Sequence, residues 1–534
     1  MSGLNTTRRA LLGGAGACAI GSLARPALAQ KAQASTLRFI PQADVTILDP
    51  LLTTAYPTRN HAHMCWDALY GVDADFVPRP QLAEGHTIED DGRRWTFVLR
   101  DGPVFHDGEK ILAKDAVASI QRWMLRDTHG QSLAARLDAI EVVDDRRFVI
   151  RLKRPFAALL DGLAKPSSYP CFVYPERFAR MDPMRGFTEV VGSGPYRFVA
   201  AERVPGALIV YERFDRYVPT LVGEPSLIAG PKIAGFARQE WKVVNDTATA
   251  TAALQSGELD WWELVNNDDE ALLRKARGLT VARLDQGGLY AALRFNQLQP
   301  PFDDPAVRRS LLAAIDQSDF MQAVAGDDAS AWRQGVGFFP VASSSASEAG
   351  MSVLTGPRDL AAAKAALAAT GKAGSAVVAL HATDVVQQNS TMSVAIDLLG
   401  KVGFKVDDVA MDFGTLVQRR ASKSPTAQGG WNVLIALFGG MDLMTPASNH
   451  LLRGNGQNAW FGWPTSPEIE RLREEWLDTT DAARQKQIAR DLQSQAFQDL
   501  PYIPLGQFFY STAYKSELQG VRKGMVLPLN ATRD

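Results

Sequence analysis

The chain has 534 residues, of which 46% are hydrophobic and 22% are charged, and its formal net charge is −2. This length is several times that of a typical domain, so more than one hydrophobic core is expected. The near balance of charges argues against nucleic acid or anionic lipid as the main partner. The longest later apolar stretch, 433–438, is too short to cross a bilayer.

The amino terminus has the pattern of an export signal. A basic segment with Arg8 and Arg9 precedes a run of small and apolar residues, and Ala27-Leu28-Ala29 offers the small-x-small site of a signal peptidase. Paired arginines before a weakly hydrophobic core favour twin-arginine export, with an ordinary secretory signal as the alternative. Residues 1–29 would then be a signal peptide. Their removal takes away three arginines and no acids, which changes the net charge from −2 to −5.

The three cysteines indicate little about function. Cys18 falls in the export signal and lacks the leucine that usually stands three residues before a lipid-anchored cysteine, so no anchor is expected. Cys65 and Cys171 remain in the mature chain. In an oxidising compartment they could pair, or both could be buried free thiols, and the sequence leaves the two alternatives open.

Strand and helix signals alternate from end to end. Residues 95–100 alternate large apolar with polar or smaller side chains and precede an Asp-Gly turn, which predicts a half-buried strand. Capping residues and apolar periodicity predict helices that begin near Asp115, at Asp304-Pro305 with the stripe Val307, Leu311 and Ile315, at Leu360, at Thr465–Glu468 and at Asp481. This alternation indicates an α/β chain.

The common catalytic signatures are missing, so no enzyme, cofactor or metal is expected. Gly192-Ser193-Gly194 is followed by Pro195 and is interpreted as a tight turn that needs the positive φ of glycine. His61 and His63 form the one His-x-His pair. Ordinary surface or cleft histidines are the favoured interpretation of this pair, and metal ligation is the alternative.

Several segments, in the same order, resemble the extracellular solute-binding proteins of ABC importers that are typified by oligopeptide- and dipeptide-binding proteins. Each segment is only a turn or a cap, but together they run through most of the mature chain. The segments are Ile47-Leu48-Asp49-Pro50, Leu69-Tyr70, 80–84, 95–100, 105–108, 115–117, 192–196, 255–260, Phe295-Asn296, 301–303, 307–309, Ile315-Asp316 and 501–505.

The resemblance implies a two-lobed periplasmic-binding-protein fold of the α/β class, with two hinge crossings and an extra subdomain in the first lobe. Lobe one would comprise 35–75, 190–292 and 503–534, with the subdomain at 76–189. Lobe two would be 293–502. The crossings are expected near 289–295 and 502–506.

The same resemblance indicates where a ligand would bind. In peptide-binding members an aspartate with Asp-x-x-x-Pro spacing takes the α-ammonium of the peptide, and Asp442 has that spacing to Pro446. The alternative is that Asp442 only caps a turn. Among the aromatic residues, Tyr56, Trp262 and Trp463 are predicted to line the cleft. Arg419 and Arg420 precede Asp442 at a distance where some relatives carry a carboxylate-binding arginine, but solvated surface arginines are the favoured interpretation.

The implied function is that of a periplasmic binding component that captures a peptide or a related amine-bearing solute for an ABC permease and its ATPase. A non-peptide ligand such as an opine, an oligosaccharide, a metal chelate or haem is the first alternative, and an exported hydrolase is the second. The protein is expected to act as a monomer.

Overall fold

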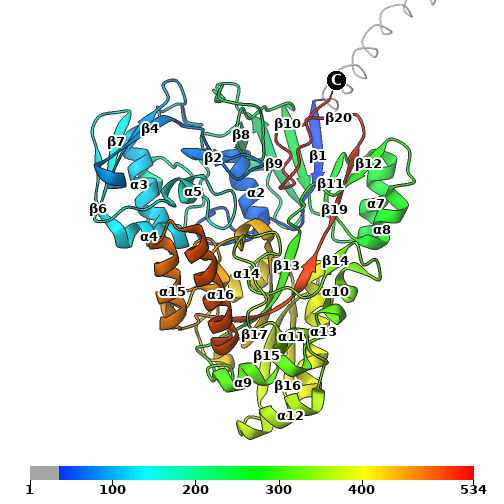
Figure 1. Ribbon diagram of the computed structural model, residues 1–534. Coiled ribbons are helices and arrows are strands. Elements are labelled where there is room, and N and C mark those ends of the chain that lie inside the picture. Colours follow the sequence, from blue (N-terminus) through cyan, green and yellow to red (C-terminus); the bar gives the residue numbers. More distant parts are fainter. Residues whose placement is uncertain (1–34, 534) are drawn as a thin grey trace, which may run out of the picture.

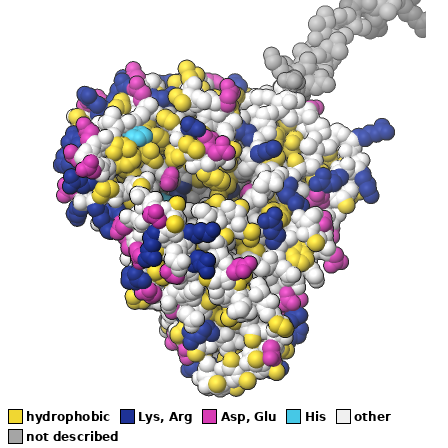
Figure 2. Space-filling model, viewed as in Figure 1, with side chains coloured by type: hydrophobic (Ala, Val, Ile, Leu, Met, Phe, Trp, Pro, Cys, Tyr) yellow, Lys and Arg dark blue, Asp and Glu magenta, His cyan; other side chains and the backbone are white. Residues whose placement is uncertain are grey.

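The computed structural model describes residues 35–533, and the predicted signal peptide with Cys18 lies outside the described residues. Two lobes are visible in Figure 1, each built on its own β-sheet. Within the described part of the chain, no helix is both long and apolar enough to cross a membrane. Figure 2 shows charged side chains of both signs spread over this face of the molecule.

Lobe one contains a seven-stranded sheet in the order β12-β19-β11-β1-β10-β9-β8. The central strand β1 pairs in parallel with both β10 and β11. Helix α2 packs beside β8, and α7 and α8 lie near β11 and β12. Its elements are β1 (Thr36–Ile40), α2 (Tyr56–Cys65), β8 (Tyr196–Phe198), β9 (Leu208–Arg213), β10 (Arg238–Lys242), α7 (Thr247–Ser256), β11 (Trp261–Val265), α8 (Asn267–Leu273), β12 (Leu279–Ala282) and β19 (Ser511–Lys515).

An antiparallel sheet of four strands, in the order β4-β5-β7-β6, forms a subdomain beside lobe one. In β5 the side chains of Trp95, Phe97 and Leu99 are buried and alternate with half-buried neighbours, which confirms the predicted strand. The elements of this region are β2 (Tyr70–Val72), β3 (Pro78–Pro80), β4 (Ala83–Glu89), β5 (Arg94–Leu99), α3 (Ala113–Trp123), α4 (Thr128–Arg136), β6 (Leu137–Val142), β7 (Arg147–Leu152), α5 (Leu159–Ala164) and α6 (Glu176–Ala179).

Lobe two contains a six-stranded sheet in the order β14-β18-β13-β17-β15-β16, and α15 and α16 reach from it to α4 of the subdomain (Figure 1). All seven residues of β13 and of β18 are buried, as expected for central strands. The elements are β13 (Leu289–Phe295), α9 (Pro305–Ser310), α10 (Gln317–Ala325), β14 (Trp332–Arg333), α11 (Ser352–Thr355), α12 (Leu360–Ala369), β15 (Ala376–Ala382), α13 (Val386–Val402), β16 (Lys405–Met411), α14 (Phe413–Arg419), β17 (Val433–Gly439), α15 (Pro467–Asp478), α16 (Ala482–Asp499) and β18 (Tyr502–Phe508). After β19 the chain ends with β20 (Leu518–Gln519) and β21 (Thr532–Arg533).

The predicted helices are present, but one prediction of length was wrong. α3, α12, α15 and α16 lie where their caps and stripes place them. α9, however, ends at Ser310, and Ile315 has an extended backbone instead of continuing the stripe. Asp316 explains the break, because its side chain accepts a hydrogen bond from the backbone N–H of Ser318 and begins α10.

The turn at Gly192-Ser193-Gly194 needs glycine for space and not for a positive φ, so that part of the prediction was wrong. A Cβ on Gly192 would lie 1.8 Å from the carbonyl oxygen of Cys65, at the end of α2. Neither Gly192 nor Gly194 has a positive φ. The turn therefore lets the backbone pass directly against the last residue of α2, where the Gly194 N–H donates to the Cys65 carbonyl at 2.8 Å.

The chain passes between the two large sheets at 283–288 and at 509–510. The segments where the crossings were expected, 289–295 and 502–506, are strands of the lobe two sheet, so this prediction is corrected. Their unbroken burial makes them part of the lobe two core. Cys65 and Cys171 are both buried free thiols, and burial raises the pKa of each.

Candidate functional site

Asp442 and Tyr56 meet at the boundary between the lobes. Tyr56 is the first residue of α2 in lobe one, and Asp442 ends a single 3₁₀ turn that follows β17 in lobe two. The Tyr56 hydroxyl donates to Asp442 Oδ2 at 2.8 Å, and the Ser167 hydroxyl donates to the same oxygen at 3.2 Å. Asp442 is 3% exposed, and its Oδ1 is buried with no hydrogen-bond partner among the described residues.

Two further buried carboxyl groups lie near this pair. Burial raises the pKa of Glu263 to about 7, and burial also raises the pKa of Asp285, with a smaller contribution from the charge of Asp442. The cation that faces them is Arg59, whose guanidinium carbon lies 3.9 Å from the centroid of the Tyr56 ring. Three carboxyl groups around one guanidinium make this end of the cleft acidic.

Burial is the main influence on the pKa of the Tyr56 hydroxyl. Burial, and next the charge of Asp442, raise the pKa of Tyr56 well above its ordinary value, so the hydroxyl stays protonated and remains a donor. The same hydroxyl also accepts a hydrogen bond from the backbone N–H of Gly439. Tyr56 therefore holds the end of β17 as well as Asp442.

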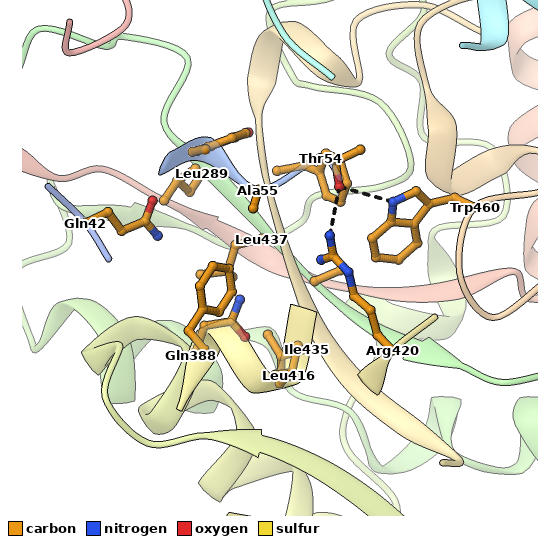
Figure 3. A pocket seen from close by; sticks show the side chains of 14 residues that line it. Gln42, Thr54, Ala55, Leu289, Gln388, Leu416, Arg420, Ile435, Leu437 and Trp460 are labelled. Atoms are coloured by element: carbon orange, nitrogen blue, oxygen red, sulfur yellow. Dashed lines mark hydrogen bonds between the residues drawn. The ribbon is translucent and has the colours of Figure 1, made fainter. Parts of the chain in front are cut away.

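A buried arginine, Arg420, lies across the cleft from this acidic end. It follows α14, is 6% exposed, and donates from Nη2 to Thr53 Oγ1 at 2.9 Å. The Trp460 indole donates to Thr54 Oγ1 at 3.2 Å, and the Arg420 guanidinium carbon lies 5.3 Å from the Trp460 ring centroid (Figure 3). Burial lowers the pKa of Arg420 to about 10, which leaves the guanidinium charged at neutral pH.

The hydrogen bonds of the Arg420 side chain among residues 35–533 go to the hydroxyls of Thr53 and Thr54 and not to a carboxylate, and its Nε makes no hydrogen bond there. An unpaired guanidinium in a buried position favours the approach of an anion. The sequence interpretation of Arg420 as a solvated surface residue was therefore wrong, because Thr53, Thr54 and Trp460 cover it. Arg419 is half-buried, and its Nε donates to the Gly429 carbonyl at 3.2 Å, so it is not a fully solvated arginine either.

Two adjoining cavities lie along the boundary between the lobes. The small cavity, of about 30 Å³, is shown in Figure 3 and is lined by Gln42, Thr54, Ala55, Tyr56, Leu289, Gln388, Phe413, Leu416, Arg420, Ile435, Ala436, Leu437, Phe438 and Trp460. The large cavity has a volume of about 590 Å³. Most of its lining comes from two sets of segments. Lobe one contributes residues within 125–131, 169 and 183–184, and lobe two contributes residues within 417–423 and 450–463. Trp460 lines both cavities, which makes them neighbours.

The four residues predicted to bind ligand are distributed over this boundary. Asp442 and Tyr56 are in contact, and Trp463 lines the large cavity. Trp262 is 6% exposed and lines a third cavity, of about 40 Å³, together with residues 384–387 of lobe two. Gln42 lines both that cavity and the small one, so Trp262 lies at the opposite end of the boundary from Trp463.

Sequence reasoning missed Arg59, Ser167, Asp285 and Glu263. None of them belongs to a recognisable motif, and only the fold brings them beside Tyr56 and Asp442. The His-x-His pair is not a surface feature. His61 and His63 are buried in α2, where His61 Nδ1 lies 2.8 Å from the Tyr211 hydroxyl and His63 Nε2 lies 2.8 Å from the Pro166 carbonyl oxygen. In the described part of the chain no three His, Cys, Asp or Glu residues are arranged to hold a metal ion.

Cavities that are lined from both lobes, with buried polar groups directed into them, define a protein that binds a solute between its lobes. Comparison with known proteins gives the family. Residues 77–460 match the family described as Bacterial extracellular solute-binding proteins, family 5 Middle. The chain belongs to the family 5 extracellular solute-binding proteins, and it is the solute-binding component of an ABC importer, as the sequence resemblance implied.

Individual relatives agree with this assignment. The chain is 33% identical to the probable peptide ABC transporter periplasmic-binding protein y4tO of Sinorhizobium fredii, over 90% of each chain. It is 26% identical to the glutathione-binding protein GsiB of Pectobacterium atrosepticum, over 89% of each chain.

Solved structures show the same two-lobed fold. The periplasmic binding protein AgaA of A. tumefaciens R10, in complex with agropinic acid, superposes with a TM-score of 0.78 at 22% identity, over 93% of this chain and 99% of that one. The binding protein DppA of Helicobacter pylori, in complex with the peptide STSA, gives 0.76 at 19% identity, over 93% and 98%. These similarities confirm the predicted fold class.

Proposed function

We propose that this protein captures a peptide, or a related amine-bearing small solute, in the cleft between its lobes, and that Asp442 binds the ammonium group. The observation that carries the proposal is the state of the Asp442 carboxylate. Tyr56 and Ser167 hold Oδ2, while Oδ1 is buried and has no partner within residues 35–533. A buried carboxylate oxygen is costly unless a donor or a cation satisfies it, and an ammonium group provides both.

The position of Arg420 supports a ligand that carries a positive charge at one end and a negative charge at the other. Arg420 lines the same small cavity as Tyr56, which holds Asp442, so we place an amine of the ligand at Asp442 and a carboxylate of the same ligand at Arg420. A peptide has this pair of groups, and an opine-type amino acid derivative has it too. The names of the relatives y4tO and DppA favour the peptide.

We also propose where the protein acts and with which partners. Export would begin with the signal at residues 1–29, with cleavage after Ala29, and the mature protein would act in the periplasm as a monomer. It would deliver its solute to the permease and ATPase subunits at the inner membrane. The family membership supports this role, and no catalytic chemistry is proposed.

Calorimetry with a pair of matched peptides tests the proposed site. Ala-Ala-Ala should bind, whereas N-acetyl-Ala-Ala-Ala, which lacks the ammonium group and is otherwise the same, should bind at least about a hundredfold more weakly. Native mass spectrometry of freshly purified protein would identify any solute that is retained from the cell. Equal affinity for the free and the acetylated peptide would contradict the role of Asp442.

A further inference from the structure

The large cavity has a one-sided charge. The titratable side chains in its lining are Arg126, Lys423, Arg453, His450 and Tyr169, and no Asp or Glu of the described chain contributes to it. Aromatic walls from Trp460, Phe461 and Trp463 complete it. A neutral or basic ligand does not require a lining with positive side chains and no acidic ones. Whether the cavity favours an acidic ligand depends on whether each positive side chain already has a carboxylate partner in the protein.

One of the cations is already neutralised. Arg453 donates from Nε and Nη2 to both carboxylate oxygens of Glu470, at 2.9–3.1 Å, and from Nη1 to Gln131. Burial, and next the positive charge of Lys165, lower the pKa of His450 below its ordinary value, which favours the neutral imidazole at neutral pH. The buried carboxylate of Asp127 lies 3.5 Å from His450 Nε2 and forms an ion pair with Lys165. These groups add no net charge to the cavity.

The other two cations have no carboxylate partner in the part of the chain that the structure describes. Arg126, half-buried on the lobe one side, donates from Nε to the Leu51 carbonyl at 3.2 Å, and its guanidinium carbon lies 5.8 Å from the Tyr169 ring centroid. Lys423, on the lobe two side, donates to Gln457 and lies 5.3 Å from the Trp463 ring centroid. Two uncompensated positive charges thus line one cavity from opposite lobes.

From this arrangement we infer that the large cavity takes an acidic group of the ligand between Arg126 and Lys423, so that the preferred solute carries at least one carboxylate beyond the one at Arg420. The inference rests on the proposed function and specifies its solute as an acidic one. An anion placed between two like charges of opposite lobes also removes their repulsion, so it favours the closed form over the open form. An acidic peptide and an opine-type amino dicarboxylate share this chemistry.

Isothermal calorimetry with four probes distinguishes the outcomes. The probes are Ala-Ala-Ala, Ala-Glu-Glu, Ala-Lys-Lys and an N-(carboxyalkyl)glutamate, which has an amine and three carboxylates without a peptide bond. Ala-Glu-Glu should bind about tenfold or more tightly than Ala-Ala-Ala, and Ala-Lys-Lys should be the weakest of the peptides. The difference between the acidic and the neutral peptide should shrink as salt is raised.

A pair of double variants tests the two cations. Arg126→Gln with Lys423→Gln should reduce the ratio of affinities for Ala-Glu-Glu and Ala-Ala-Ala from about ten to about one. The control, Arg277→Gln with Lys364→Gln, removes the same charge from exposed positions outside the cavity lining and should keep the ratio. Because the readout is a ratio within each variant, a general loss of affinity does not imitate the expected result.

The results separate this inference from the proposed function. Equal binding of neutral and acidic peptides would overturn the inference and leave the proposed function intact. Tight binding of the N-(carboxyalkyl)glutamate alone would support the acidic site and overturn the choice of a peptide. An unchanged affinity ratio in the Arg126 and Lys423 variant would overturn the assignment of these two residues.

Discussion

The hydroxyl of Tyr56 donates a hydrogen bond to Asp442 Oδ2 at 2.8 Å across the boundary between the lobes. The two residues are 386 positions apart in the sequence: Tyr56 begins α2 in lobe one, and Asp442 ends the 3₁₀ turn that follows β17 in lobe two. A ligand that binds the free oxygen of Asp442 therefore adds to a contact that already joins the lobes. If Asp442 binds the ligand as proposed, ligand binding and lobe closure are coupled at this residue.

Replacement of Asp442 should abolish amine recognition. Asp442→Ala would leave a ligand ammonium buried and unpaired, a cost of about 3–5 kcal/mol, so the affinity for Ala-Ala-Ala should fall several hundredfold or more in calorimetry. Asp442→Asn should also bind poorly, because the amide loses the charge. If Asp442 were only a cap, thermal melting would instead show about 1 kcal/mol of lost stability, largely restored by Asn, with nearly normal binding.

Arg420 should determine whether the protein distinguishes a free carboxylate from an amide. The wild-type protein should bind Ala-Ala-Ala at least about tenfold more tightly than its C-terminal amide, because a charge-assisted hydrogen bond is lost. In Arg420→Gln this preference should disappear. The matched control is the half-buried neighbour Arg419→Gln, which lies outside the lining of both cavities and should retain the preference. Persistence of the preference in Arg420→Gln would place the carboxylate elsewhere.

An ion-pair cluster away from the cleft should also affect affinity. Arg136, 0% exposed at the end of α4, donates to Glu474 at 2.9 Å and to Asp478 at 2.6 Å, both on α15. Glu474→Gln with Asp478→Asn would leave Arg136 buried without a counter-charge only when the lobes are in contact, which favours the open form. We expect about tenfold weaker binding and a larger radius of gyration in solution scattering.

The control for that variant lies on the same helix. Glu468→Gln with Glu475→Gln removes the same charge from α15, but these carboxylates pair with Arg471 and Arg484 on its exposed surface. Exposed pairs contribute little, so affinity and compactness should stay near the wild-type values. Equal effects of the two double variants would show that the charge of α15, and not the contact with Arg136, is responsible.

Acid should destabilise the fold through buried histidines. Burial lowers the pKa of His61, His63 and His129 to about 3 each, below the ordinary value of 6.5. The unfolded state therefore binds more protons than the folded state as pH falls, so the free energy of unfolding decreases from about pH 6.5 toward pH 3. Each histidine contributes about 1.4 kcal/mol per pH unit in this range.

Glu263 acts in the opposite direction. Its pKa is raised to about 7 by burial, so the folded state binds its proton first and gains stability as pH falls from about 7 to the ordinary value of 4.5. This offsets roughly one histidine, so the three histidines and Glu263 together should give a net loss of about 2–3 kcal/mol per pH unit between pH 6 and 5, to which His106 adds because burial lowers its pKa to about 4. Urea unfolding at pH 7.5, 6 and 5 measures it. A constant free energy of unfolding from pH 6 to 5 would contradict the burial of these imidazoles.

The export signal predicts a specific failure of secretion. Arg8→Lys with Arg9→Lys should leave uncleaved precursor in the cytoplasm if the twin-arginine route is used, and the wild-type mature protein should begin at Gln30 by amino-terminal sequencing. Normal secretion of the double variant would assign export to the general secretory route.

The order of elements could be predicted from the sequence because it depends on local signals. The strand at 95–100 and the helices that begin at Leu360 and Asp481 are marked by alternation and caps within a few residues. The break after Ser310 could not be predicted, because the apolar stripe continues to Ile315 while the cap at Asp316 competes with it.

The candidate binding site was only partly predictable, because contacts between distant parts of the chain build it. Asp442 and Tyr56 could be chosen from a resemblance and from residue type. The burial of Arg420 depends on Thr53, Thr54 and Trp460, and Thr53 is 367 positions away, so no local pattern reports it. Trp261 and Trp262 are neighbours on β11 and face opposite sides of the sheet, and composition alone does not tell which side faces the other lobe.

The position of β19 has a consequence for the order in which the molecule forms. β19 is made of residues 511–515, yet it lies inside the lobe one sheet between β12 and β11. Lobe two is a continuous segment whose first and last strands pair directly, with Leu289 opposite Phe508. During synthesis lobe two can therefore fold as a unit before residue 511 is available. The lobe that contains the beginning of the chain is completed last, when nearly the whole chain has been made.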